Sequence, residues 1–74
     1  MSPALPQVSG KQVVLVLEAA GFEYRSTKGS HAKLRHPDGR VVIVPLHRSL
    51  ARGTLGSILR QAGLSTSEFA RLLN

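Results

Sequence analysis

The stretch that decides the fold is KGSHAKLRHPDGRVVIV, residues 28–44, because it holds two strand patterns around a turn. Residues 30–36 alternate polar and apolar side chains, with Ala32 and Leu34 on one face, and residues 41–44 are all aliphatic. Alternation with a period of two is typical of a half-buried strand. The Pro-Asp-Gly turn between them favours chain reversal, because proline presets φ and glycine tolerates the left-handed region. The stretch therefore predicts an antiparallel hairpin.

The residues before this hairpin predict a helix and one more strand. Residues 11–20 carry apolar side chains at helical spacing, between a candidate N-cap at Ser9 and a closing glycine. Residues 22–27 alternate again, and we expect Phe22 and Tyr24 on the buried face of this strand.

The residues after the hairpin predict a loop and two helices. Pro45 ends the strand because it lacks an N–H, and residues 46–53 form a loop. Residues 54–62 carry a helical apolar stripe, and Ser65-x-x-Glu68 is a capping-box pattern that begins a short last helix. The predicted fold class is therefore α+β, in the order α-β-β-β-α-α, with a three-stranded antiparallel sheet and helices on one face.

The length of 74 residues fits one domain, which we assign to residues 9–74 after an N-terminal tail of residues 1–8. The absence of cysteine excludes a disulfide-stapled scaffold and a thiolate zinc finger, and it fits a cytoplasmic location. The apolar runs are far shorter than the roughly 20 residues of a membrane-spanning helix. The N-terminus also lacks the pattern of a signal peptide. We therefore expect no membrane insertion.

The net charge of +6 predicts an anionic partner. Nucleic acid is the first candidate, an acidic protein the second and a membrane surface the third. Only three aromatic residues occur, which favours contacts with phosphates over stacking on bases. The alternative is that the charge only aids solubility.

His31 is the main candidate for chemistry. By the alternation it shares the polar face of its strand with Lys33 and Arg35, and Lys28 lies three residues before it. An exposed histidine among cations suits proton transfer on a phosphate ester. The adjoining Gly29-Ser30 lets a phosphate approach backbone N–H groups. The alternative is an ordinary surface histidine that only touches a partner.

The other two histidines have different expected roles. His47 follows the third strand and should leave the sheet at the His31 end, where it could contact a phosphate; the alternative is a plain loop residue. His36 should face the opposite side from His31, so this pair cannot chelate a metal, and we expect a structural role for it. The four carboxylates are dispersed along the chain, so we expect no metal site and no cofactor.

Short motifs follow one another in a characteristic order. They are Ser9-Gly10-Lys11, Leu17-Glu18-Ala19-Ala20-Gly21-Phe22, Lys28-Gly29-Ser30-His31, Val44-Pro45-Leu46-His47, Arg52-Gly53-Thr54-Leu55, Ile58-Leu59 and Gln61-Ala62-Gly63-Leu64. In this order they resemble the HicA family of toxins, which are small mRNA interferases of bacterial type II toxin–antitoxin pairs. The resemblance runs from about Ser9 to Leu73. Residues 1–8 depart from it, since many members begin close to the Ser-Gly-Lys start.

The resemblance implies a fold similar to the double-stranded RNA-binding domain. It implies cleavage of mRNA without a metal by one histidine, which is His31 on this sequence. It also implies a HicB-type antitoxin that covers the toxin and blocks this site, and a higher-order toxin–antitoxin complex is one expected form of the pair.

Residues and resemblance together predict a toxin that acts as a metal-independent endoribonuclease on mRNA. The RNA 2′-hydroxyl would attack the adjacent phosphorus, and His31 would move a proton as acid or base. Two alternatives stay open: a non-cleaving RNA-binding module of the same fold, and a domain that binds only an acidic protein partner. The residues expected to contact the phosphate or RNA are Lys28, Gly29, Ser30, Lys33, Arg35 and His47.

Overall fold

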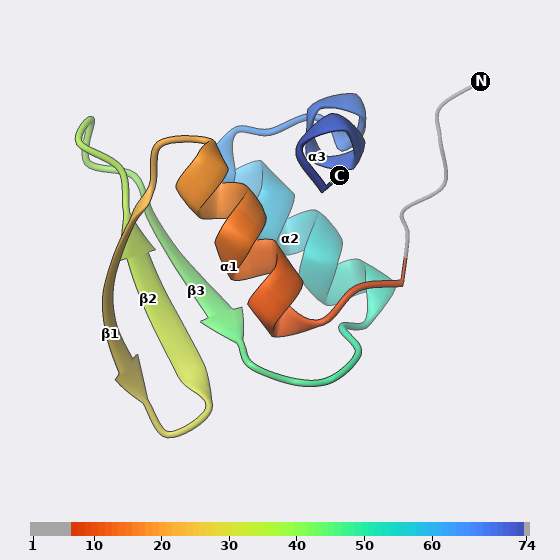
Figure 1. The fold of residues 1–74 in the computed structure, drawn as a ribbon, viewed down its shortest axis with the longest axis horizontal. Helices are drawn as coiled ribbons and strands as arrows, with labels where there is room; N and C mark the ends of the chain where they lie inside the picture. Colours follow the sequence, from red (N-terminus) through yellow and green to blue (C-terminus); the bar gives the residue numbers. More distant parts are fainter. Residues whose placement is uncertain (1–6, 74) are drawn as a thin grey trace.

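Three antiparallel strands form one sheet, and helices α1 and α2 cover one side of it (Figure 1). The computed structural model describes residues 7–73. The sheet order β1-β2-β3 and the order of elements confirm the predicted α+β fold, which is consistent with that of the double-stranded RNA-binding domain. The elements are α1 (Gly10–Ala19), β1 (Glu23–Lys28), β2 (His31–Arg35), β3 (Val41–Pro45), α2 (Arg52–Ala62) and α3 (Thr66–Leu73).

β2 and β3 form the predicted antiparallel hairpin around the Pro-Asp-Gly turn. Arg35 pairs with Val41, and Ala32 pairs with Val44. Ala32, Leu34 and Val44 are fully buried under the helices, as half-buried strands require. The residues between them are exposed on the sheet face away from the helices, which we call the open face.

Helix α1 begins with the cap that its sequence favours. The Ser9 hydroxyl accepts a hydrogen bond from the Gln12 N–H at 3.2 Å, and the Gln12 side chain accepts one from the Ser9 N–H at 2.9 Å. This reciprocal pair satisfies two N–H groups that the helix itself leaves free. Val13, Val16 and Leu17 then point into the core, where Val13 and Leu17 are fully buried.

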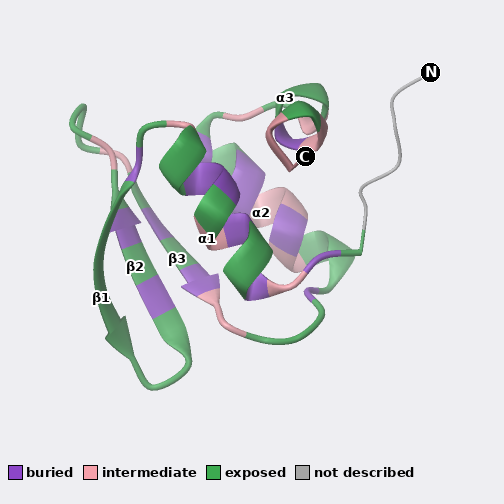
Figure 2. Cartoon of the chain, viewed as in Figure 1, coloured by how far each residue is buried: buried purple, intermediate pink, exposed green. Residues whose placement is uncertain are grey.

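Strand β1 differs from the expected half-buried strand. All six of its residues are exposed (Figure 2). Phe22 is buried as expected, but it lies before the strand begins, and Tyr24 is 47% exposed. β1 is an edge strand, and its register with β2 shifts between Tyr24 and Ser26. The bulge changes the alternation only after Tyr24, which does face the helix side opposite Leu34; Tyr24 stays half-exposed because it lies at the edge of the sheet, in an open groove beside α1.

Val8 is the last residue of the range assigned to the N-terminal tail, residues 1–8. Residues 1–6 of that range lie outside the described residues. Val8 itself is only 3% exposed and belongs to the core. Its carbonyl accepts a hydrogen bond of 2.8 Å from the N–H of Leu50, which is also buried. The packed structure therefore begins before the cap of α1.

The two C-terminal helices follow their predicted patterns. α2 begins two residues before the expected Thr54 and ends at Ala62, as predicted. The next residue, Gly63, has a φ of 71°, the left-handed conformation of a helix-terminating glycine. Ser65 and Glu68 form the predicted capping box of α3, with hydrogen bonds of 2.9 and 3.1 Å. The hydrogen bond from the Ser65 backbone N–H, followed by one from the Ser65 side chain, lowers the pKa of the Glu68 carboxyl. Phe69 of α3 is fully buried and closes the core.

Arg40 ties the β2–β3 turn to the end of α2. Its guanidinium donates to the Ala62 carbonyl and bonds the Asp38 carboxylate at 2.9 Å, and it lies 5.2 Å from the centre of the Phe22 ring. The side-chain hydrogen bonds from Arg40 lower the pKa of Asp38 to about 2. The contact thus joins three segments of the chain.

The Asp38–Arg40 contact predicts that the stability of the fold depends on pH. The pKa of Asp38 is depressed in the folded protein, so its contribution is present above the ordinary value of 3.8 and is lost as pH falls toward about 2. We expect the melting temperature to fall over this range, and to fall less in Arg40→Met. Thermal melts of both proteins from pH 5 to pH 2 measure the difference. Equal falls in the two proteins would contradict the assigned contact.

Candidate nucleic-acid interface

A basic hollow on the open face is the candidate site. It has a volume of about 460 Å³. Lys28 of β1 and His31 and Lys33 of β2 line it, together with Ser26 and Ile43. None of these five lining residues carries a carboxylate, so the hollow presents positive charge to a ligand. The structure thus brings together three of the predicted site residues.

The bulge in β1 places Lys28 on this face. Without it, Lys28 would have the same parity as Tyr24, which lies opposite the inward-facing Leu34. The register shift after Tyr24 instead pairs Lys28 with His31 and Ser26 with Lys33. Cross-strand partners project to the same face of a sheet, so the shift moves two β1 side chains toward His31.

His47 lies beside His31, as the hairpin register predicts. Their ring centroids are 6.4 Å apart, with an angle of 73° between the planes. Both side chains are exposed. The turn between β1 and β2 and the loop after β3 lie at the same end of the sheet (Figure 1), and the Leu46 N–H donates to the Ser30 carbonyl at 2.6 Å. This bond joins the residues that precede the two histidines.

A second anchor for His47 comes from α1. The Gly10 N–H donates to the His47 carbonyl at 2.9 Å. A Cβ at position 10 would meet the Pro45 carbonyl oxygen and would lie 2.8 Å from the Leu46 Cα. Only glycine therefore allows the first turn of α1 to approach this backbone so closely. The helix and the loop together fix where His47 leaves the sheet.

The remaining predicted site residues surround the hollow without lining it. Arg35 is on the open face, where it pairs with Glu23 and lies two positions beyond Lys33. Gly29 and Ser30 form the turn that leads into His31, and the φ of 60° at Gly29 explains the glycine there. Arg35 is thus a neighbour of the site rather than part of the hollow.

His36 has the structural role that its position predicts. Its ring packs edge-on against Phe22, with centroids 5.1 Å apart. Its Nδ1 accepts a hydrogen bond of 3.2 Å from the Asp38 N–H. The ring is therefore engaged within the turn and away from His31.

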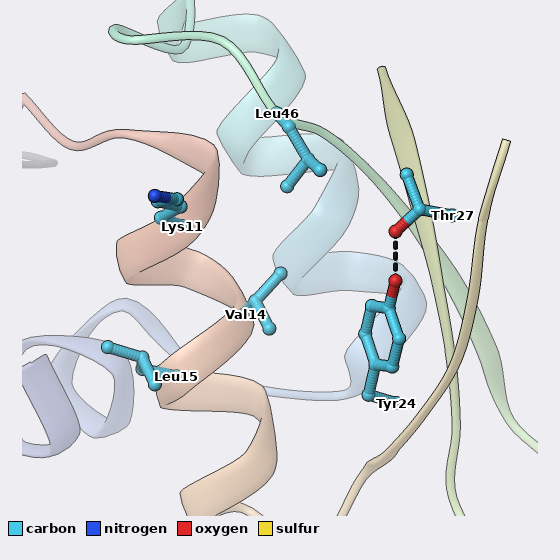
Figure 3. Close-up of a pocket in the computed structure, with 6 residues that line it drawn as sticks. All are labelled: Lys11, Val14, Leu15, Tyr24, Thr27 and Leu46. Carbon is cyan, nitrogen blue, oxygen red and sulfur yellow. Dashed lines mark hydrogen bonds between the residues drawn. The ribbon is translucent and has the colours of Figure 1, made fainter. Parts of the chain in front are cut away.

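An apolar groove between α1 and β1 has a different character (Figure 3). Its volume is about 320 Å³, and Lys11 is the one charged residue among the six that line it. Tyr24 and Thr27 project into this groove, where their hydroxyls share a hydrogen bond. A groove of this kind suits apolar side chains, whereas the basic hollow on the open face suits a phosphate.

Three residues that form or support the basic hollow and the His47 loop were not predicted from the sequence: Ser26, Ile43 and Gly10. Ile43 could have been found from its parity, since it alternates with the buried residues of β3. Ser26 reaches the hollow only through the bulge, which leaves no signal in the sequence. Gly10 stood in a quoted motif, but its contact with the loop after β3 becomes visible only in three dimensions.

Within residues 7–73, no three histidine, aspartate or glutamate side chains gather closely enough to hold a metal ion. Over the same part of the chain, no helix has the length and apolar character that crossing a membrane requires.

Comparison with known proteins identifies the family. Residues 10–64 match the family model described as HicA toxin of bacterial toxin-antitoxin. The match begins at the first residue of α1 and ends just after α2, so it contains the whole sheet and both histidines of the site. No curated protein matches the chain. Because the matched part is well over half of the 74 residues, the chain belongs to the HicA family of bacterial toxins, which act in pairs with a cognate antitoxin.

Proposed function

We propose that this toxin is a metal-independent endoribonuclease that cleaves mRNA at the basic hollow, with His31 as a catalytic residue. The observation that supports it is that His31 lines the hollow together with Lys28 and Lys33, among lining residues that include no carboxylate. A phosphodiester placed there would meet a proton-transfer group and two cations at once.

The proposed reaction is a transfer within the RNA itself. The 2′-oxygen loses its proton and attacks the adjacent phosphorus, and the bond from phosphorus to the 5′-oxygen breaks. The leaving oxygen takes up a proton, so the products carry a 2′,3′-cyclic phosphate and a 5′-hydroxyl. Lys28 and Lys33 would contact the non-bridging oxygens, where negative charge grows in the transition state. Neighbouring parts of the RNA would be contacted by the Ser26 hydroxyl, by the Gly29 and Ser30 amides and by Arg35.

The proposed partner is a HicB-type antitoxin that covers this hollow. An acidic or apolar segment of such a protein would fit the exposed cations and the exposed Val41 and Ile43 of the open face, both more than 40% exposed. The proposal places the pair in the cytoplasm, where mRNA is translated, and allows a higher-order complex.

Chelation tests the metal-independent reaction. We expect purified toxin to cleave single-stranded RNA at the same rate in EDTA as in magnesium, because the proposed groups that move protons and hold the phosphate all belong to the chain. The measurement is the rate of cleavage of an end-labelled RNA in the two buffers. Loss of cleavage in EDTA that a divalent ion restores would contradict the proposal.

Salt dependence tests the proposed phosphate contacts. Lys33→Gln should weaken RNA binding and reduce the slope of log K against log salt by about 0.7–1, because each phosphate contact releases counterions. Arg60→Gln is the matched control, since Arg60 is exposed on α2, on the helix side of the sheet. Binding isotherms with a non-cleavable RNA at several salt concentrations give both slopes. Equal slopes in the two variants would show that Lys33 does not contact an RNA phosphate.

A further inference from the structure

The proposed reaction needs two proton transfers. One proton leaves the 2′-hydroxyl, and one must reach the 5′-oxygen as its bond to phosphorus breaks. A single imidazole cannot accept the first and donate the second at the same moment. We infer that His47 is the second catalytic residue, and that His31 and His47 divide the roles of general base and general acid; this inference rests on the proposed ribonuclease activity.

The separation of the two rings fits this division. With centroids 6.4 Å apart, the two rings can both contact one phosphodiester that lies across them at the His31 end of the hollow. Each nitrogen must come within about 2.6–3.2 Å of its oxygen. The two oxygens stand on opposite sides of the phosphorus during in-line attack, so groups on two sides of the phosphate are required. The angle of 73° between the ring planes shows that the two imidazoles are not stacked on each other.

The position of His47 is held by backbone bonds on both sides. The Leu46 N–H bonds the Ser30 carbonyl, and the His47 carbonyl accepts from the Gly10 N–H. The side chain of His47 carries no part of this anchoring and is exposed, as is that of His31. A histidine held by its backbone, with a free imidazole beside the candidate site, is suited to touch a substrate.

The other groups near the hollow are less suited to this role. Lys28 and Lys33 line the hollow beside His31, where ammonium groups best hold the non-bridging oxygens. The His36 ring is engaged with Phe22 and with the Asp38 N–H in the next turn. His47 is thus the second exposed imidazole at the His31 end of the hollow, and imidazole is the side chain that most often transfers protons in catalysis.

A modified leaving group tests this inference. We would measure cleavage of a short RNA and of the same RNA with sulfur in place of the 5′-bridging oxygen. A thiolate is much less basic than an alkoxide and leaves without a proton, so this substrate does not need the general acid. Both substrates are given to the unmodified toxin and to its His31→Ala, His47→Ala and His47→Gln variants. Ser49→Ala, two positions along the same loop, is the control for disturbance of the loop.

We expect His31→Ala and both His47 variants to cleave ordinary RNA about 10²–10⁴-fold more slowly than the unmodified toxin. On the sulfur substrate, the variants at one of the two positions should recover to within tenfold of the unmodified toxin, and those at the other should not. The position that recovers is the general acid. Ser49→Ala should stay within threefold on both substrates.

Other outcomes overturn the inference in distinguishable ways. His47 variants that cleave ordinary RNA within threefold of the unmodified toxin would remove His47 from catalysis and leave the ribonuclease intact. Equal responses of His31 and His47 variants to the sulfur substrate would show that the two do not divide the roles. An unmodified toxin that cleaves neither substrate would overturn the proposed function itself, and the inference with it.

Discussion

Replacing His31 with alanine is expected to slow RNA cleavage about 10²–10⁴-fold and to leave the fold unchanged. The side chain is exposed on the open face, so its removal creates no cavity in the core. It lies in the hollow with Lys28 and Lys33, which remain to hold the phosphate. Binding of a non-cleavable RNA should therefore change little while the rate of cleavage falls. Single-turnover kinetics and binding isotherms measure the two effects separately.

His36→Ala is the matched control, because it removes a histidine one residue beyond the end of the same strand. The His36 ring packs on Phe22 at a centroid distance of 5.1 Å, so we expect a loss of about 0.5–1.5 kcal/mol of stability. Its cleavage rate, measured well below the lowered melting temperature, should match that of the unmodified toxin. A variant at position 31 that folds and cleaves normally would contradict the catalytic assignment.

Gly10→Ala is expected to destabilise the fold strongly. The added Cβ would strike the Pro45 carbonyl oxygen, and backbone atoms cannot turn aside as a flexible side chain can. Overpacking of this kind costs about 1–3 kcal/mol and sometimes more. For a domain of this size, each kcal/mol lowers the melting temperature by about 4–8 °C. The same displacement would move His47, whose carbonyl bonds Gly10, so cleavage should also fall.

Gly53→Ala is the control for this substitution. Gly53 lies in the first turn of α2 without a positive φ, and a Cβ there would have nothing within 4 Å. Alanine favours a helix over glycine, so this variant should melt at or above the temperature of the unmodified toxin. Thermal melts of the two variants side by side make the comparison. Similar melting temperatures for both would show that the close approach at Gly10 is not required.

The sequence was sufficient to predict those parts of the fold that depend on local periodicity. The alternation around Ala32 and Leu34 gave the buried face of β2. The turn between β2 and β3 gave their antiparallel pairing, and with it the approach of His47 to His31. Capping patterns at Ser9 and Ser65 marked the starts of α1 and α3. These features follow from neighbouring residues, and the packed structure does not override them.

The features that the sequence did not predict depend on contacts between distant segments. The bulge of β1 arises in its pairing with β2, and because of this bulge Lys28 faces the hollow. Val8 is buried in the core and bonded to Leu50, which lies 42 residues later: the Leu50 N–H donates to the Val8 carbonyl. The need for glycine at position 10 arises from the backbone of Pro45 and Leu46. The periodicity within one segment does not report contacts with distant segments. The residues that line the hollow could therefore be identified only from the structure.

The chemical identity of the new RNA ends tests the central proposal most directly. Purified toxin would be incubated in EDTA with a single-stranded RNA, and the fragments analysed by mass spectrometry and by their response to end-modifying enzymes. The account predicts fragments with 2′,3′-cyclic phosphate and 5′-hydroxyl ends, produced by the unmodified toxin and not by His31→Ala. Fragments with 5′-phosphate ends, or intact RNA that the toxin binds in a salt-dependent way, would contradict it. The latter result would favour a module that binds RNA without cleaving it.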